Sequence, residues 1–227
     1  MKNKYEKKII DTLIKPLVHA AAEERPKNQL ESQKHYAHRL QSQLTKALHD
    51  FEKRLKAGVS ALDQHKKWPH DERLNKVALL LKDKHDLEMQ SEQPKTLQEI
   101  LEFSDEELVD FYAVGKESYE RANYQEAGNI FVLLTQLNPK VGSFWSALGA
   151  AEEMNGDIEG ASHAYIFGSE LEMKTLAPYL HGAQCLVKLN KLEEAKKLLN
   201  RAIQRGTEEQ QLHSDLDAAK ELLKSIS

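Results

Sequence analysis

The second half of the chain repeats a pattern every 34 residues. A small residue recurs at Gly115, Gly149 and Ala183, and an aromatic side chain stands four positions before each of them. An alanine follows each small residue after twelve positions, and a bulky apolar side chain stands four positions further on. A fixed period of this length is typical of a solenoid whose units stack on their neighbours. The aromatic, alanine and bulky positions are Phe111, Trp145 and Tyr179; Ala127, Ala161 and Ala195; and Phe131, Tyr165 and Leu199.

The spacing resembles that of the tetratricopeptide repeat, a pair of antiparallel helices. The small residue lets the second helix approach the first closely, and the alanine of the second helix faces that gap. Turn-forming residues fall where such a pair must reverse, at Ala122-Asn123, Asn155-Gly156-Asp157 and Asn190-Lys191. The sequence therefore predicts three repeats near residues 108–141, 142–175 and 176–207.

The flanks of the repeats carry helix signals of their own. Ser104 is followed three residues later by Glu107, which predicts a capping box at the start of the first repeat. After the third repeat we expect a terminal helix over 208–226, capped by Thr207. Gly and Pro are scarce, at 10 and 6 residues, which also favours helices. We therefore predict an all-α fold, a short right-handed solenoid with a terminal helix. The apolar stripe of that helix is Leu212, Leu216, Ala219 and Leu223.

The first 94 residues differ from the rest in charge. They hold 19 basic and 14 acidic side chains, whereas residues 95–227 hold 13 and 22. Apolar residues at helical spacing predict helices near 4–24, 30–57 and 71–90, the last two forming a hairpin with its break at Gly58 and Trp68-Pro69. We therefore divide the chain into a helical extension, 1–94, and a repeat domain, 95–227. The two hairpin stripes are Leu40, Leu44, Ala47, Leu48, Phe51 and Leu55, and Leu74, Val77, Ala78 and Leu81.

A stack of such repeats has a concave face lined mainly by the first helix of each unit. Its mixture of apolar and polar side chains suits an extended peptide held by a few apolar anchors. The alternative for each residue is an ordinary place in the core or on a solvated helix face. The predicted groove positions are Tyr112, Lys116, Tyr119, Glu120, Ser143, Ser146, Ala150, Glu153, Met154, Ala177, Leu180, Gln184, Val187 and Lys188.

One known groove chemistry can be tested on the sequence directly. Repeat proteins that grip the acidic tails of heat-shock chaperones use a carboxylate clamp of Lys and Asn side chains. The corresponding positions here hold one cation, so the sequence argues against docking of that kind. These positions are Tyr112, Lys116, Ala147, Ala177 and His181.

The stretch from Thr96 to about Ile226 resembles the type III secretion tetratricopeptide chaperones of the SycD/LcrH/IpgC kind, here with an atypically long N-terminal helical extension. The matching segments are TLQEILEFSDEELVDFYAVG, YQEAGNIFVLLTQLNP and YLHGAQCLVKLNKLEEAKKLL. The resemblance implies a chaperone that holds hydrophobic translocator proteins in the bacterial cytoplasm before export. It places groove aromatics at Tyr112, Tyr119 and Tyr124, and it puts Lys116 where relatives often carry an aromatic residue.

The sequence shows no constellation for catalysis. It has no Gly-rich phosphate loop, GxSxG elbow or HExxH motif. His35 and His38 share a helix face, but no third ligand completes a metal site, and His65 and His70 are no more convincing. Cys185 is the only cysteine, and its apolar neighbours indicate a packing thiol. We expect a protein that is not an enzyme and uses no cofactor.

Compartment and partners follow from composition and from the resemblance. A single cysteine suits a reducing compartment, no apolar run is long enough to span a bilayer, and the N-terminus does not look like a secretory signal. The acidic second half argues against nucleic-acid binding. A scaffold or assembly factor acting through the N-terminal hairpin, or a transcription co-regulator, is the alternative function. A homodimer and a second protein partner for residues 1–94 are left open.

Overall fold

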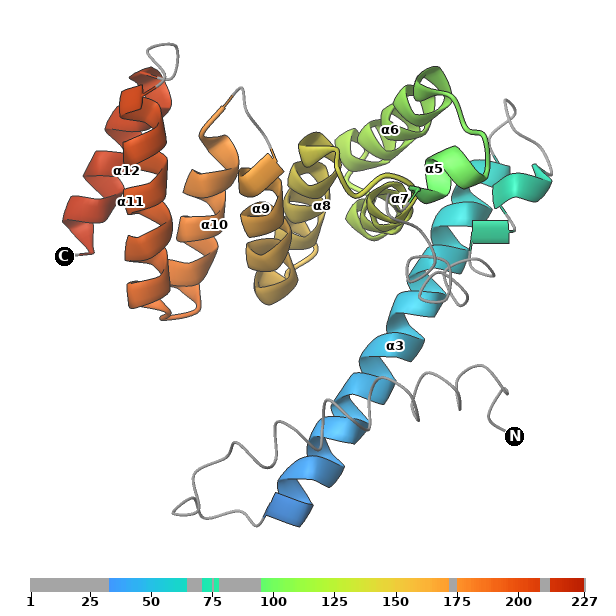
Figure 1. Ribbon diagram of the computed structural model, residues 1–227, viewed down its shortest axis with the longest axis horizontal. Helices are drawn as coiled ribbons and strands as arrows, with labels where there is room; N and C mark the ends of the chain where they lie inside the picture. The colour runs from blue at the N-terminus through green and yellow to red at the C-terminus, as the bar shows by residue number, and fades with distance from the viewer. Residues whose placement is uncertain are drawn as a thin grey trace. The chain divides into compact units, whose positions relative to one another are not determined.

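The computed structural model is helical wherever it assigns regular structure to the residues that it describes (Figure 1). Contacts group the chain into two compact units. The N-terminal unit comprises Met1–Lys56 and Asn75–Pro94, and the repeat unit comprises Ala57–Leu74 and Lys95–Ser227. The predicted helix near 4–24 and most of the one near 71–90 lie outside the described residues, as does Leu212. The structure describes residues 33–64, 71–74, 76–77, 95–171, 175–208 and 213–226.

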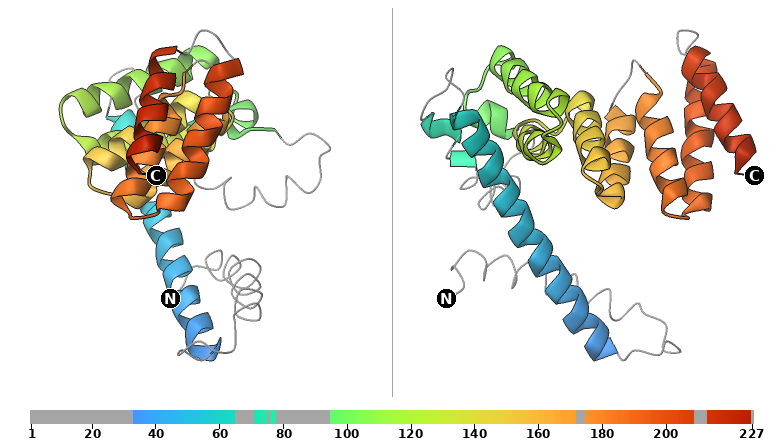
Figure 2. Two further views of the ribbon diagram at one scale, coloured as in Figure 1. Left: turned by 90° about the vertical axis from the view of Figure 1, so that its left-hand side faces the viewer. Right: turned by 180° about the vertical axis from the view of Figure 1, so that it is seen from behind.

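Three helix pairs and a terminal helix occupy the predicted repeat region. Figures 1 and 2 show them side by side in chain order. The predicted all-α repeat architecture is confirmed. The bounds are α6 (Asp105–Glu120) and α7 (Tyr124–Leu137), α8 (Gly142–Met154) and α9 (Ile158–Leu171), α10 (Ala177–Lys188) and α11 (Leu192–Glu208), and α12 (His213–Ser225).

The turns inside the three repeats share one geometry. Ala122, Gly156 and Asn190 are 34 residues apart and have φ values of 61°, 88° and 58°. The backbone N–H of the residue after each of them donates to the carbonyl five residues earlier, at 2.9, 2.9 and 2.8 Å. Together the left-handed residue and this bond form the Schellman motif that ends a helix. The three turns predicted from the sequence are confirmed.

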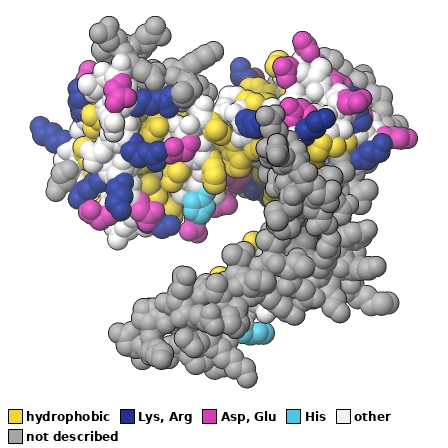
Figure 3. All heavy atoms as spheres, in the orientation of Figure 1, with side chains coloured by type: hydrophobic (Ala, Val, Ile, Leu, Met, Phe, Trp, Pro, Cys, Tyr) yellow, Lys and Arg dark blue, Asp and Glu magenta, His cyan; other side chains and the backbone are white. Residues whose placement is uncertain are grey.

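In the first two repeats the small residue of the first helix faces the bulky residue of the second helix. A Cβ atom on Gly115 would lie 2.8 Å from the Phe131 ring, and one on Gly149 would lie 2.7 Å from the Tyr165 ring. Trp145 is only half-buried. Its indole stacks on the exposed ring of Phe167, with ring centroids 5.0 Å apart. Hydrophobic side chains thus also reach the surface of the repeat unit (Figure 3).

The ends of the repeat region confirm one predicted cap and overturn another. The Ser104 hydroxyl accepts from the Glu107 N–H, and the Glu107 carboxylate accepts from the Ser104 N–H, as the capping box requires. The sequence reading missed a second capping box, at Thr96 of the short helix α5 (Leu97–Ile100). Thr207 is not the cap of the terminal helix. It lies inside α11, where its hydroxyl donates to the Ile203 carbonyl at 2.7 Å.

Helix α3 (Gln33–Asp63) contains the long helix predicted near 30–57 but does not break at Gly58. That prediction was wrong because Gly58 serves close packing. A Cβ atom there would lie 3.0 Å from the carbonyl carbon of Asn129 in α7. Leu62, further along α3, is fully buried. The end of α3 is therefore part of the repeat unit.

Arg73 fastens a second segment to the start of the first repeat. Its guanidinium lies 2.7 Å from the Asp71 carboxylate, 2.5 Å from the Glu107 carboxylate and 4.3 Å from the centre of the Phe103 ring. Leu74 beside it is buried. Residues on both sides of position 94 therefore belong to the repeat unit. The division of the sequence into domains at residues 94 and 95 stays a prediction.

Candidate peptide-binding groove

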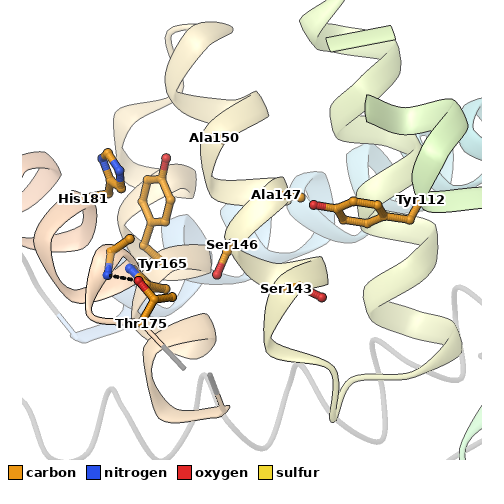
Figure 4. A pocket seen from close by; sticks show the side chains of 10 residues that line it. Tyr112, Ser143, Ser146, Ala147, Ala150, Tyr165, Thr175 and His181 are labelled. Atoms are coloured by element: carbon orange, nitrogen blue, oxygen red, sulfur yellow. Dashed lines mark hydrogen bonds between the residues drawn. The ribbon is translucent and has the colours of Figure 1, made fainter. Parts of the chain in front are cut away.

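The first helices of the three repeats line most of an open pocket of about 380 Å³, the groove cavity (Figure 4). Residues of α8 form its centre, and residues of α6, α9 and α10 complete it. Ser143 and Ala177 occupy the same place in consecutive repeats, so the lining follows the 34-residue register. The lining residues are Tyr112, Ser143, Ser146, Ala147, Ala150, Tyr165, Thr175, Ala177, Pro178 and His181.

Two aromatic side chains form walls of the groove cavity. In Figure 4, Tyr112 and Tyr165 lie on either side of the α8 residues. The Tyr112 ring packs against Phe131 and Phe144, with centroids 5.5 and 6.0 Å away. The Tyr165 ring is 4% exposed and stacks on the His181 imidazole at 5.3 Å. Core packing therefore holds both walls in place before any ligand arrives.

The floor of the groove cavity is uncharged. Ala147, Ala150 and Ala177 contribute only methyl groups, which leaves room for a side chain of a ligand. Two of the hydroxyls are already used: the Ser146 hydroxyl donates to the Gly142 carbonyl at 3.1 Å, and the Thr175 hydroxyl donates to Asp215 at 3.0 Å. None of the lining residues that the structure describes is Lys, Arg, Asp or Glu. Such a cavity favours an apolar side chain, because an unpaired charge would lose its hydration there.

The groove cavity coincides with the positions of the carboxylate clamp. Tyr112, Ala147, Ala177 and His181 line it, and Lys116 does not. Instead, Lys116 lies 3.6 Å from Glu120 on the same exposed helix face. Aromatic, methyl and imidazole groups thus stand where a clamp would need Lys and Asn, in agreement with the sequence prediction.

A polar cluster joins α8, α9 and α10 beside the groove cavity. The Glu153 carboxylate accepts from the Lys188 ammonium at 2.6 Å and from the Tyr165 hydroxyl at 3.2 Å. Burial, and next the charge of Glu153, raise the pKa of Tyr165, which keeps this hydroxyl a donor. Tyr119 packs edge-on against Tyr124 at 5.2 Å, and burial is the main reason that its pKa is raised.

The predicted site residues thus separate into groups. Tyr112 and Ala150 line the groove cavity. Leu180 and Val187 do not line it, because they pack against the core that α10, α11 and α12 share. For the remaining predicted residues, a place in the binding site stays a prediction. These residues are Lys116, Tyr119, Tyr124, Glu153, Met154 and Gln184.

Tyr165, Thr175 and Pro178 line the groove cavity but were not among the predicted groove positions. Tyr165 was assigned to the core. Its second role, as a wall of the groove cavity, was missed because one ring serves both the core and the cavity. His181 was considered only as a clamp position. The stacking of its exposed imidazole on the buried Tyr165 ring is visible only in the structure.

Cys185 fits the predicted role of a packing thiol. It is fully buried, and burial, followed by the charge of Glu153, raises its pKa to about 11. Among the described residues no group of three or more His, Cys, Asp or Glu side chains could hold a metal ion. His35, His65 and His70 have no described side chains. In the same part of the chain, none of the helices is both long and apolar enough to cross a membrane.

Stacked helix pairs with an apolar cavity on their first helices define a tetratricopeptide-like solenoid. No family model matches the chain. It is 28% identical over 132 residues to low calcium response locus protein H of Yersinia pestis, covering 58% of this chain and 74% of the relative. The protein of the same name from Yersinia pseudotuberculosis matches equally well.

Solved structures give the same result. The Yersinia enterocolitica chaperone SycD in complex with a peptide of the translocator YopD is 25% identical, with a TM-score of 0.50, and the match covers 55% of this chain and 95% of that one. A type III secretion complex from Aeromonas hydrophila shares the fold, with a TM-score of 0.55 at 23% identity over 65% of this chain and 94% of that one. The chain is thus similar to LcrH in sequence and to SycD in fold, which confirms the predicted resemblance.

Proposed function

We propose that this chain is a type III secretion chaperone that binds an extended segment of a hydrophobic translocator protein in its concave groove. In this role it keeps the translocator soluble and competent for export in the bacterial cytoplasm, and it acts by binding rather than catalysis. The observation that carries the proposal is the uncharged groove cavity, with aromatic walls and an alanine floor at the clamp positions. The YopD peptide complex of SycD supports it.

The geometry suggests how binding works. An apolar side chain of the client enters between the Tyr112 and Tyr165 rings, and its burial contributes about 1.5–3 kcal/mol. Because core packing already holds both rings, little conformational entropy is lost on binding. Tyr119 and Met154 extend the contact along the groove in this proposal. Binding to the chaperone competes with aggregation of the client, and in this proposal a few strong anchors are sufficient for it.

A charge placed in the floor tests this function. Ala147→Arg puts a guanidinium into the groove cavity and should weaken binding of the YopD peptide at least about tenfold, because the charge fills and polarises the anchor site. Ala113→Arg is the matched control, since Ala113 holds the same repeat position but lies outside the cavity lining. Calorimetry measures the affinity, and circular dichroism checks the fold. Equal affinity in both variants would place the binding site elsewhere.

A further inference from the structure

At the edge of the groove cavity the Glu153 side chain bonds to both neighbouring helices. It belongs to α8, it accepts from Tyr165 of α9, and it pairs with Lys188 of α10. Its side chain is only 20% exposed, whereas that of Lys188 is 53% exposed. The ion pair therefore links the second repeat to the third at a place where one partner is largely withdrawn from water.

The Tyr165 wall is fixed on three sides. Gly149 lies against one part of the ring so closely that a Cβ atom would overlap it. The His181 imidazole stacks on the ring at an interplanar angle of 23°. Glu153 holds the hydroxyl at the tip. Because Gly149 belongs to α8 and His181 to α10, the ring keeps its place only while these two helices keep their spacing.

We propose that Glu153 and Lys188 are positioning residues of the groove cavity, which hold α8 and α10 at the spacing that Tyr165 needs to form its wall. The proposal rests on the proposed function for its consequence in peptide binding. Its structural part, the coupling of the second and third repeats, can be measured without any ligand. Neither residue lines the cavity, so the pair acts through Tyr165 and His181.

The chain contains its own reporter of this spacing. Cys185, the only cysteine, is fully buried in a cluster with Ala161 and Tyr165. Because Ala150 of α8 also packs against this cluster, a thiol reagent can reach Cys185 only when α10 separates from α8 and α9. The labelling rate of Cys185 in the full-length protein therefore reports how often this interface opens.

Lys188→Met is the decisive variant, because two effects on labelling have opposite signs. Lys188 lowers the pKa of Cys185 and Glu153 raises it, so losing Lys188 by charge alone would leave less thiolate and slow the reaction. A loosened interface would speed it. We expect labelling about two- to fivefold faster, as suits a partly exposed pair. Lys196→Met is the matched control, because Lys196 pairs with Glu193 within α11. Labelling no faster than in the wild type would overturn the proposal.

Charge exchange tests the position of the pair rather than its chemistry. Glu153→Lys and Lys188→Glu each place like charges together and should raise labelling and weaken YopD peptide binding by about tenfold. The double variant should return both to within about threefold of wild type. Altered binding with unaltered labelling would overturn the proposal, since the pair would then touch the peptide directly. A wild-type protein that does not bind the peptide would refute the proposed function, and the labelling rates would still decide the positioning role.

Discussion

Helices α7 and α9 hold the same place in consecutive repeats and have the same length, yet they differ in burial. Ten of the 14 residues of α7 are buried, and six of the 14 of α9. At one shared position Leu133 is fully buried and Phe167 is 57% exposed. Four residues on, Leu137 is fully buried and Leu171 is 38% exposed. Their inner faces, by contrast, match: Ala127 and Ala161 are both fully buried.

The difference comes from residues outside the repeats. A Cβ atom on Gly58 of α3 would lie 3.3 Å from that of Leu133, so the end of α3 covers the outer face of α7. In the third repeat the same position holds Arg201, which pairs with Glu170 at 2.6 Å. The register thus determines the inner faces of the helices. The outer faces change from covered and apolar to exposed and charged along the solenoid.

The largest effect on stability should come from truncating Leu133 and Phe167, which hold the same position in α7 and α9. Leu133→Ala leaves a cavity under α3 and should lower the free energy of unfolding by about 2–5 kcal/mol. Phe167→Ala removes an exposed ring that stacks on Trp145, so we expect a loss of at most about 1 kcal/mol. Urea denaturation measures both. Equal losses would mean that the cover over α7 contributes little to stability.

The close approach of α3 can be broken from the other side. Gly58→Val forces a branched side chain against the backbone of Asn129, and we expect a loss of about 1–3 kcal/mol. Gly160→Ala is the control in α9, because the atoms nearest to its added Cβ atom belong to the Asp157 side chain and not to another helix. If denaturation midpoints show the control to be as destabilised as Gly58→Val, steric contact with α7 is not the cause.

Much of the repeat unit could be predicted from the sequence because its contacts are local. The aromatic and small residues of one helix pair lie close together in the chain, so their spacing carries the information on α6 to α11. Gly58 and Asn129 lie 71 positions apart, and no periodic signal connects them. Gly58 was therefore interpreted by local propensity alone, as a helix break.

The groove was predictable to the same extent. Tyr112 and Ala150 follow from the register, since a helix face is a local property. Leu180 also packs against the core that α12 helps to form, a contact that depends on how the chain returns after the third repeat. Its place in the binding site stays a prediction. Tyr165 was missed because one ring serves both the core and the cavity.

The contacts of Arg73 with Asp71 and Glu107 should stabilise the repeat unit by an amount that depends on pH. We expect Arg73→Met to cost about 1 kcal/mol at pH 7, since the groups are only partly buried. Hydrogen bonds from Arg73 hold the pKa values of Asp71 and Glu107 below their usual values. Depressed carboxyl pKa values stabilise the fold above the unfolded values near 4, and this contribution is lost as the pH falls through the folded values. The gap between variant and wild type in denaturation midpoints should therefore narrow below about pH 4, and a constant gap would contradict this explanation.

The smallest effect on stability is expected at the turns, where the first two repeats have the same geometry. Ala122 and Gly156 end the first helices of their repeats with the same left-handed turn, but only Gly156 lacks a Cβ atom. Because an L-residue is strained at positive φ, Ala122→Gly should stabilise the protein by about 0.5–1 kcal/mol. Gly156→Ala should destabilise it by a similar amount, and no atom lies within 4 Å of the added Cβ to complicate the comparison. Opposite shifts of the urea midpoint are expected. Shifts of the same sign would show that the two turns are not equivalent, and that the difference between the repeats reaches beyond their outer faces.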